Sequence, residues 1–134
     1  MSNKYYKKLL KDLRGKRPVA TYDLGCDQAK ILRENKNRSG TYCLINKKNG
    51  KRYVGSSIDL CKRLRYYLRI NDMIILPGAR SAIYSSLKKN GLGDFILVIL
   101  DTCAPENVTS QEQHYIDSLI NIGVDYNLNP KAGS

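Results

Sequence analysis

The stretch SGTYCLINKKNGKRYVGSS, residues 39–57, constrains the fold more than any other part of the chain. Apolar side chains alternate along both of its halves, which is typical of strands. Asn49-Gly50 lies between the halves and is the strongest short signal for a two-residue hairpin turn. With that turn, Leu44 faces Gly55 across the two strands. The sequence therefore predicts an antiparallel hairpin with Asn49-Gly50 at its tip.

The alternation sorts the side chains of this hairpin onto two faces, because successive residues of a strand point in opposite directions. One face is wholly apolar and consists of Cys43, Ile45 and Val54. The other face carries Tyr42, Leu44 and Tyr53. We expect the apolar face to lie against the core. The two tyrosines then either pack across the strands, as ordinary sheet residues do, or face a substrate.

Further elements follow the hairpin. Asp59 is placed to cap a helix that ends near Leu68, and residues 69–79 contain a proline and a glycine typical of a loop. Residues 80–90 predict a helix closed by a glycine. The continuous apolar run Phe95–Leu100 predicts a buried central strand.

The two ends of the chain also carry helix signals. A T-x-x-E pattern, Thr109 to Glu112, predicts a capping box at the start of the last helix. Residues 1–17 hold seven basic side chains and one acidic one, and predict either a short basic amphipathic helix or a disordered arm. Residues 22–36 predict a second short helix.

The whole chain is strongly basic, with 23 lysines and arginines against 12 acidic residues and a net charge of +11. Such a surface favours a polyanionic partner, and nucleic acid is the commonest one. The ten tyrosines agree with that partner, because phenol rings stack on bases and hydroxyls bond to phosphates. Most tyrosines in proteins simply pack, however, so they do not prove it.

Several other classes of protein are disfavoured. The chain has no run of 18 apolar residues, so no membrane-spanning helix is expected, and its N-terminus lacks the apolar core of a secretory signal. The four cysteines form no C-x-x-C pair and His114 is the only histidine, which argues against a zinc site. We expect free thiols in a reducing intracellular compartment, with Cys43 and Cys61 buried.

An ordered set of motifs resembles a known family. G-T-Y at 40–42, Y-V-G at 53–55, Arg63, Glu112 and Tyr126-Asn127 are similar, in order and spacing, to the GIY-YIG nuclease domain over about residues 31–134. The chain is most similar to homing endonucleases encoded in mitochondrial group I introns. The resemblance assigns residues 31–134 to the catalytic domain and leaves residues 1–30 as a basic N-terminal arm.

The resemblance implies a fold and a reaction. The fold is of the α/β (α+β) class, with a small three-stranded antiparallel sheet flanked by helices. The reaction is hydrolysis of phosphodiester bonds in double-stranded DNA with one divalent metal, normally Mg²⁺, for which Mn²⁺ is a substitute. It also implies a mitochondrial location and a monomer that is linked to, or lacks, a separate DNA-binding domain.

The family pattern assigns roles to four residues. Glu112 matches the metal-binding glutamate, and a single carboxylate suffices because Mg²⁺ keeps several waters. Arg63 matches an invariant arginine and would clamp the phosphate oxygens. Tyr42 matches the first motif tyrosine and is the candidate base, although a free phenol has a pKa near 10 and needs nearby positive charge. Tyr53 would orient the water or the phosphate.

Five further positions belong to this hypothesis. Tyr67 stands where several relatives carry a histidine, which leaves phenols as the nearby proton carriers. Asn127 matches a late asparagine and is expected to fix the chain near the site. Gly55, Lys62 and Arg65 are assigned to DNA binding.

Each assignment has an ordinary alternative. Glu112 is already explained by the capping box, Asn127 by a turn, and Arg63 by one of many basic surface positions. The intact motif set nevertheless favours an active enzyme. The competing functions are an inactive DNA-binding or splicing-helper module and a structure-specific nuclease that repairs branched DNA.

Overall fold

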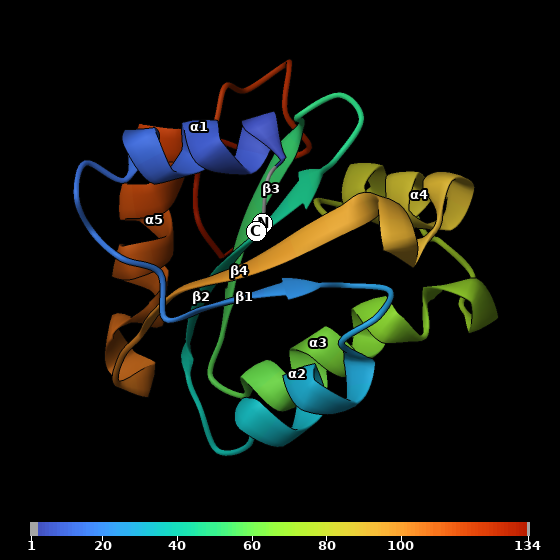
Figure 1. Cartoon of the computed structure of the whole chain (residues 1–134), viewed down its shortest axis with the longest axis horizontal. Helices are drawn as coiled ribbons and strands as arrows, with labels where there is room; N and C mark the ends of the chain where they lie inside the picture. Colours follow the sequence, from blue (N-terminus) through green and yellow to red (C-terminus); the bar gives the residue numbers. More distant parts are fainter. Residues whose placement is uncertain (1–2, 134) are drawn as a thin grey trace.

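The computed structural model describes residues 3–133, so the outermost residues of the predicted segments (1, 2 and 134) lie outside the described range. The chain forms one antiparallel sheet with helices on both sides (Figure 1). The strands are β1 (Ala20–Asp23), β2 (Gly40–Asn46), β3 (Arg52–Ser57) and β4 (Phe95–Thr102), and their order in the sheet is β1-β4-β2-β3.

The sheet has four strands, and the sequence predicted three. The additional strand is β1, which pairs antiparallel with β4 from Ala20 opposite Ile99 to Asp23 opposite Ile96. The predicted helix over residues 22–36 therefore begins later, as α2 (Gln28–Glu34). With β1 in place, β4 is hydrogen-bonded on both sides, which confirms that it is a central strand.

The hairpin of β2 and β3 forms, but in a different register from the predicted one. Leu44 pairs with Tyr53, and Tyr42 pairs with Gly55. Residues 47–50 make a longer loop, in which the Asn46 side chain accepts a hydrogen bond from the Lys48 amide at 2.8 Å. Because the register differs by an even number of residues, every side chain stays on its predicted face.

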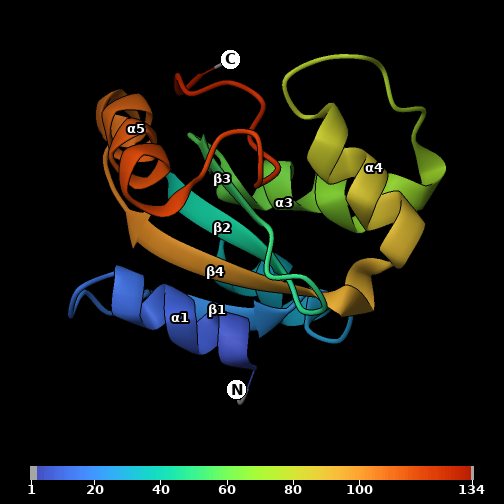
Figure 2. The same ribbon diagram turned by 90° about the horizontal axis from the view of Figure 1, so that it is seen from above.

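Both faces of the sheet are buried, although only one was expected to meet the core. The predicted apolar face packs with α1 (Lys4–Asp12) and α5 (Val108–Leu119). The face with the two tyrosines packs with α2, α3 (Leu60–Leu68) and α4 (Ser81–Asn90). Figure 1 shows these two groups of helices on opposite sides of the sheet, and Figure 2 shows α1, α3, α4 and α5 from above. The uninterrupted apolar sequence of β4 supplies side chains to both cores.

The boundaries of α3 and α4 agree with the sequence signals, whereas the start of α5 does not. The Asp59 carboxylate caps α3 by accepting the Lys62 amide at 3.1 Å, as predicted, and Gly91 closes α4 with a φ of 89°. The capping box expected at α5 is wrong, because the helix begins at Val108 with Asn107 at the cap position. Glu112 is thereby available for other partners.

The basic N-terminal segment is a helix and is packed against the domain. Leu9 and Leu13 of this segment are buried in the core shared with α5, whereas Leu10 is exposed. Asp12 accepts a hydrogen bond from the Arg52 guanidinium at 2.8 Å. These contacts confirm the helical alternative over residues 4–12.

Two other observations concern the whole described chain. No helix within residues 3–133 is both long and apolar enough to cross a membrane. All four cysteines are free, and Cys43 and Cys61 are buried as predicted. Burial raises the pKa of the Cys43 thiol to about 12, which favours the neutral thiol over the thiolate.

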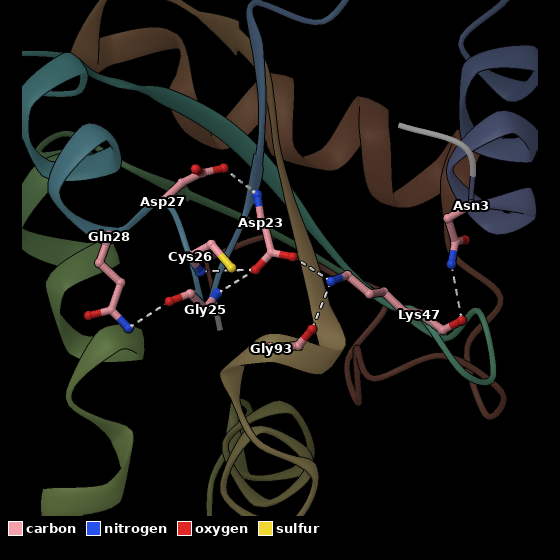
Figure 3. Close-up of polar contacts among 8 residues, drawn as sticks. All are labelled: Asn3, Asp23, Gly25, Cys26, Asp27, Gln28, Lys47 and Gly93. Carbon is pink, nitrogen blue, oxygen red and sulfur yellow. Dashed lines mark hydrogen bonds and ion pairs between the residues drawn. The ribbon is translucent and has the colours of Figure 1, made fainter.

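Asp23, at the end of β1, links segments that are far apart in the sequence (Figure 3). One carboxylate oxygen accepts the amides of Gly25 and Cys26 at 2.9 and 3.0 Å. The other accepts the Lys47 ammonium at 2.5 Å, and Lys47 also donates to the Gly93 carbonyl at 2.7 Å. One ion pair and one hydrogen bond of Lys47 therefore hold together the end of β1, the hairpin loop and the segment before β4.

This ion pair predicts a pH-dependent stability. Burial alone would raise the pKa of Asp23, but the Lys47 ammonium and the two amides outweigh it, so its pKa lies below the ordinary value. The contribution is present above the unfolded-state pKa, near 3.9, and is lost as the pH falls through the folded-state pKa. We expect Asp23→Asn to lower the free energy of unfolding by about 1–3 kcal/mol at about pH 7 and by much less at about pH 3.

Urea denaturation at the two pH values measures this difference. Asp72→Asn is the matched control, because Asp72 is exposed and is expected to have little effect at either pH. An equal loss of stability at both pH values in Asp23→Asn would contradict the assigned role of the ion pair.

Candidate active site

Gly55 explains how the two motif tyrosines fit on one face of the hairpin. A Cβ atom at Gly55 would lie 2.5 Å from the Tyr42 hydroxyl and 3.0 Å from the Tyr53 ring. The glycine of the Y-V-G motif therefore provides the space in which both rings pack. Gly55 itself is buried beneath them, so the structure gives it a steric role.

The hydroxyl groups of Tyr42 and Tyr67 are hydrogen-bonded to each other on the sheet face that packs with α2, α3 and α4. Both side chains are fully buried, and their hydroxyl oxygens are 2.5 Å apart. The Tyr67 ring also lies 5.8 Å from the ring of Tyr84 on α4. Burial raises the pKa of both Tyr42 and Tyr67 well above the ordinary value of a phenol.

Tyr53, Glu112 and Asn127 line one small cavity, so the structure brings together three of the predicted site residues. Tyr53 is 5% exposed and Glu112 is 9% exposed. They approach the cavity from opposite faces of the sheet, Tyr53 from the α3 and α4 side and Glu112 from α5. They can meet because β3 is an edge strand with a paired neighbour on one side only.

The Glu112 carboxylate is held by two hydrogen bonds. One oxygen accepts the Ser56 hydroxyl at 2.7 Å, and the other accepts the Gly133 amide at 3.0 Å. Ser56 was not predicted, although strand alternation places it on the same face as Val54, where α5 lies. Each carboxylate oxygen has two lone pairs, so these bonds do not exhaust its capacity to accept.

The residues at the cavity fit a Mg²⁺ ion better than a Zn²⁺ ion. Residues 3–133 contain no group of three or more His, Cys, Asp or Glu side chains that could surround an ion. A zinc site needs such a group, whereas Mg²⁺ binds through one or two carboxylates and keeps several waters. Glu112 therefore fits as a single anchor for Mg²⁺.

Asn127 joins the C-terminal segment to the open edge of β3. Its side-chain oxygen accepts the Val54 amide and its side-chain nitrogen donates to the Val54 carbonyl, both at 2.9 Å. The Tyr126 amide donates to the Arg52 carbonyl at 2.8 Å. Both donor and acceptor groups of Asn127 are engaged, so this residue positions the chain beside the cavity.

Two arginines lie near the phenols, and the sequence identified only one of them. Arg63 on α3 has a buried Nη1 atom without a hydrogen-bond partner within residues 3–133, and its charge acts on Tyr42 and Tyr53. Arg80, just before α4, is in hydrogen-bonding contact with Tyr53. Burial raises the pKa of Tyr53, and the Arg80 charge and hydrogen bond oppose that rise. No motif marks Arg80, because its position depends on the path of the 69–79 loop.

The two basic residues assigned to DNA binding lie outside the cavity. Lys62 and Arg65 are exposed on α3 and line a shallow surface hollow with Tyr66 and Arg69. Arg63, on the same helix, faces the tyrosines. One helix therefore presents basic side chains both to the surface and to the candidate site.

Comparison with known proteins agrees with this arrangement. A family model of the GIY-YIG catalytic domain matches residues 38–121, which is more than half of the chain. Over 112 residues the chain is 30% identical to the probable intron-encoded endonuclease bI1 of Neurospora crassa. That match covers 78% of this chain and 23% of the relative, so the chain spans less than a quarter of the relative's length.

The fold is similar to a solved structure as well. That structure is a mutant of the catalytic domain of the intron endonuclease I-TevI, with a TM-score of 0.57 and 25% sequence identity. The similarity covers 69% of this chain and 95% of that chain. The family model and the fold together identify a catalytic domain of the GIY-YIG class. The chain belongs to the GIY-YIG family, as the sequence predicted.

The steric role of Gly55 can be tested directly. We expect Gly55→Ala to displace the Tyr42 and Tyr53 rings, to lower the free energy of unfolding by about 1–3 kcal/mol, and to reduce nuclease activity by at least about tenfold. Gly93→Ala is the matched control, because a Cβ atom at Gly93 meets nothing within 4 Å. Thermal unfolding and DNA cleavage by both variants measure the effect, and equal behaviour of the two would refute it.

Proposed function

We propose that this domain is a metal-dependent DNA endonuclease of the intron-homing type. The observation that carries the proposal is the cavity at the edge of β3, which a phenol and a carboxylate line together, with the charges of two arginines acting on that phenol. Each group has a role in phosphodiester hydrolysis. That the matched relative is named an intron-encoded endonuclease supports the homing type and an organellar location.

Glu112 would hold the metal in this mechanism. The Ser56 hydroxyl and the Gly133 amide fix the carboxylate at the cavity, which limits the entropy that binding an ion would cost. When bound, Mg²⁺ would supply positive charge that polarises the phosphate and stabilises the leaving oxygen. The same requirement is met by Mn²⁺, which also prefers oxygen ligands.

Arg63 would bind the phosphate, because its planar guanidinium matches two phosphate oxygens at once. The buried Nη1 atom without a partner supports this role, since burying an unsatisfied N–H group costs about 1–3 kcal/mol unless a ligand completes it.

Tyr53 is the phenol best placed to accept a proton from the attacking water. The sequence favoured Tyr42, but Tyr42 is fully buried and its hydroxyl is engaged with Tyr67. Tyr53 lines the cavity with Glu112. We therefore assign proton acceptance to Tyr53 and assign Tyr42 and Tyr67 to packing that orients the Tyr53 ring.

The DNA duplex would lie across the exposed side of α3. Lys62, Arg65 and Arg69 lie on this surface, and each would neutralise phosphates of the backbone. Such contacts supply affinity without reading sequence. We propose a monomer that acts on double-stranded DNA and is linked to a separate DNA-binding domain for recognition of its target site.

The metal role of Glu112 gives the first functional prediction. We expect Glu112→Gln to reduce Mg²⁺-dependent nicking of supercoiled plasmid by about 100-fold or more, because the anionic ligand is lost. DNA affinity should stay within about twofold, because affinity comes from neutralised phosphates. Nicking assays and gel-shift binding measure the two quantities, and Glu106→Gln is the control because Glu106 is exposed outside the cavity.

Two other outcomes would point to other functions. Equal loss of binding and cleavage in Glu112→Gln would contradict the metal role. Absence of cleavage by the unmodified chain would favour the inactive DNA-binding or splicing-helper module, and cleavage of branched DNA alone would favour the repair nuclease.

The clamp role of Arg63 gives a second functional prediction. We expect Arg63→Lys to be nearly as harmful as Arg63→Ala, about 100-fold in cleavage rate, because lysine is a point charge and cannot bind two oxygens in one plane. Arg33→Lys is the matched control, since Arg33 is exposed on α2. The measurement is the single-turnover rate on a duplex, and a near-normal rate for Arg63→Lys would rule out the clamp.

A further inference from the structure

Arg80 is the residue at this site that neither the motifs nor the family pattern assigns. It occupies the cap position before α4, at the end of the 69–79 segment. Its side chain is partly buried and is in hydrogen-bonding contact with the Tyr53 phenol. Its charge also acts on Tyr42 and Tyr67. Arg80 is therefore a second cation directed at the same cluster of phenols as Arg63.

The unsatisfied hydrogen-bond donors of the described chain indicate an anion-binding site beside Tyr53. Within residues 3–133, two buried side-chain N–H groups have no hydrogen-bond partner, and they are Nη1 of Arg63 and Nε of Arg80. A buried N–H group without a partner costs about 1–3 kcal/mol, so native proteins rarely keep one. Both donors belong to arginines whose charges act on Tyr53. An anion that reached both arginines beside Tyr53 would satisfy both donors.

We propose that Arg80 is a second arginine of the catalytic centre, which binds an oxygen of the scissile phosphate through its free N–H group while it holds the Tyr53 hydroxyl. This inference rests on the proposed function, since the phosphate of the DNA backbone is the anion. Arg80 would fix the distance between the proton acceptor and the phosphate. A single guanidinium forms both contacts, because its five N–H donors lie in one plane.

The same arrangement explains how a buried phenol can act in this reaction. The Tyr53 phenolate accepts a proton from the attacking water while the new bond from oxygen to phosphorus forms. The bond from phosphorus to the leaving oxygen breaks, and that oxygen takes a proton from solvent. Positive charge beside Tyr53 favours the phenolate over the phenol and therefore increases the reactive fraction at a given pH.

The charged and titratable groups around Tyr53 do not all act in the same direction. Arg80 and Arg63 favour the phenolate, whereas Glu112 opposes it. The other neighbours are two phenols and one lysine that lines the cavity: Tyr42, Tyr67 and Lys131. Arg80 is in hydrogen-bonding contact with the Tyr53 hydroxyl and opposes the rise in its pKa, so removal of Arg80 should shift the titration of Tyr53 to higher pH.

The test compares Arg80→Ala and Arg80→Lys with Lys89→Ala. Lys89 is exposed on α4, and Lys89→Ala also removes one positive charge. This variant therefore controls for the general electrostatic attraction of DNA. The single-turnover cleavage rate of a duplex is measured with Mg²⁺ from about pH 6 to about pH 9.5, at constant ionic strength. Thermal unfolding of each variant shows whether it is folded, and Arg80→Lys keeps the test valid if Arg80→Ala is not.

We expect Arg80→Ala to lower the rate about 100-fold near neutral pH, and the deficit to shrink as the pH rises, because alkaline solution ionises Tyr53 without help. In a Tyr53→Phe background, Arg80→Ala should lower the cleavage rate by a much smaller factor than it does in the unmodified chain. A merely structural role would lower the rate equally at every pH and in both backgrounds.

The outcomes separate this inference from the function on which it rests. A rate for Arg80→Ala equal to that of Lys89→Ala at every pH, in a chain that Glu112→Gln inactivates, overturns the inference and leaves the proposed function intact. A pH-independent deficit also overturns it. A chain that cuts no DNA at any pH overturns both.

Discussion

The open edge of β3 determines where an active site can form in this fold. β3 is paired on one side by β2, and its other side would expose backbone N–H and C=O groups. The C-terminal segment satisfies them, through Asn127 on Val54 and through Tyr126 on Arg52. This closure brings the tail beside the strand, and the Gly133 amide then reaches Glu112. The pairing of the C-terminal segment with β3 thus forms a wall of the cavity and also brings the Gly133 amide to the Glu112 carboxylate.

Burial on both faces of the sheet makes that edge rigid. Tyr53 projects into the core of α2, α3 and α4, while Val54 projects into the core of α1 and α5. The phenol of Tyr53 and the carboxylate of Glu112 on α5 are therefore positioned by elements on opposite faces of the sheet. Because close-packed cores resist displacement, the site is held in place before any ligand binds. The N-terminal helix contributes to this rigidity through Leu9 and through the pair of Asp12 with Arg52.

The sequence predicted those features that depend on local pattern. Alternation along 39–57 assigned Tyr42 and Tyr53 to one face correctly, because an even change of register leaves faces unchanged. The register itself was wrong, because the Asn46 side chain stabilises a longer loop that competes with Asn49-Gly50. β1 was missed because its partner in β4 is distant in the sequence. Arg80 was missed for the same reason: its relation to Tyr53 is created by tertiary packing and leaves no local signal.

Burial and nearby positive charge act in opposite directions on the pKa of the phenol at the candidate site. A phenol buried in an apolar core resists ionisation, and three such phenols lie together here. Two of them, Tyr42 and Tyr67, share one hydrogen bond and are removed from solvent. The third, Tyr53, reaches the cavity and lies under the charge of two arginines. Burial thus orients the Tyr53 ring, and the two arginines offset the electrostatic cost of burial at the one phenol that lines the cavity with Glu112.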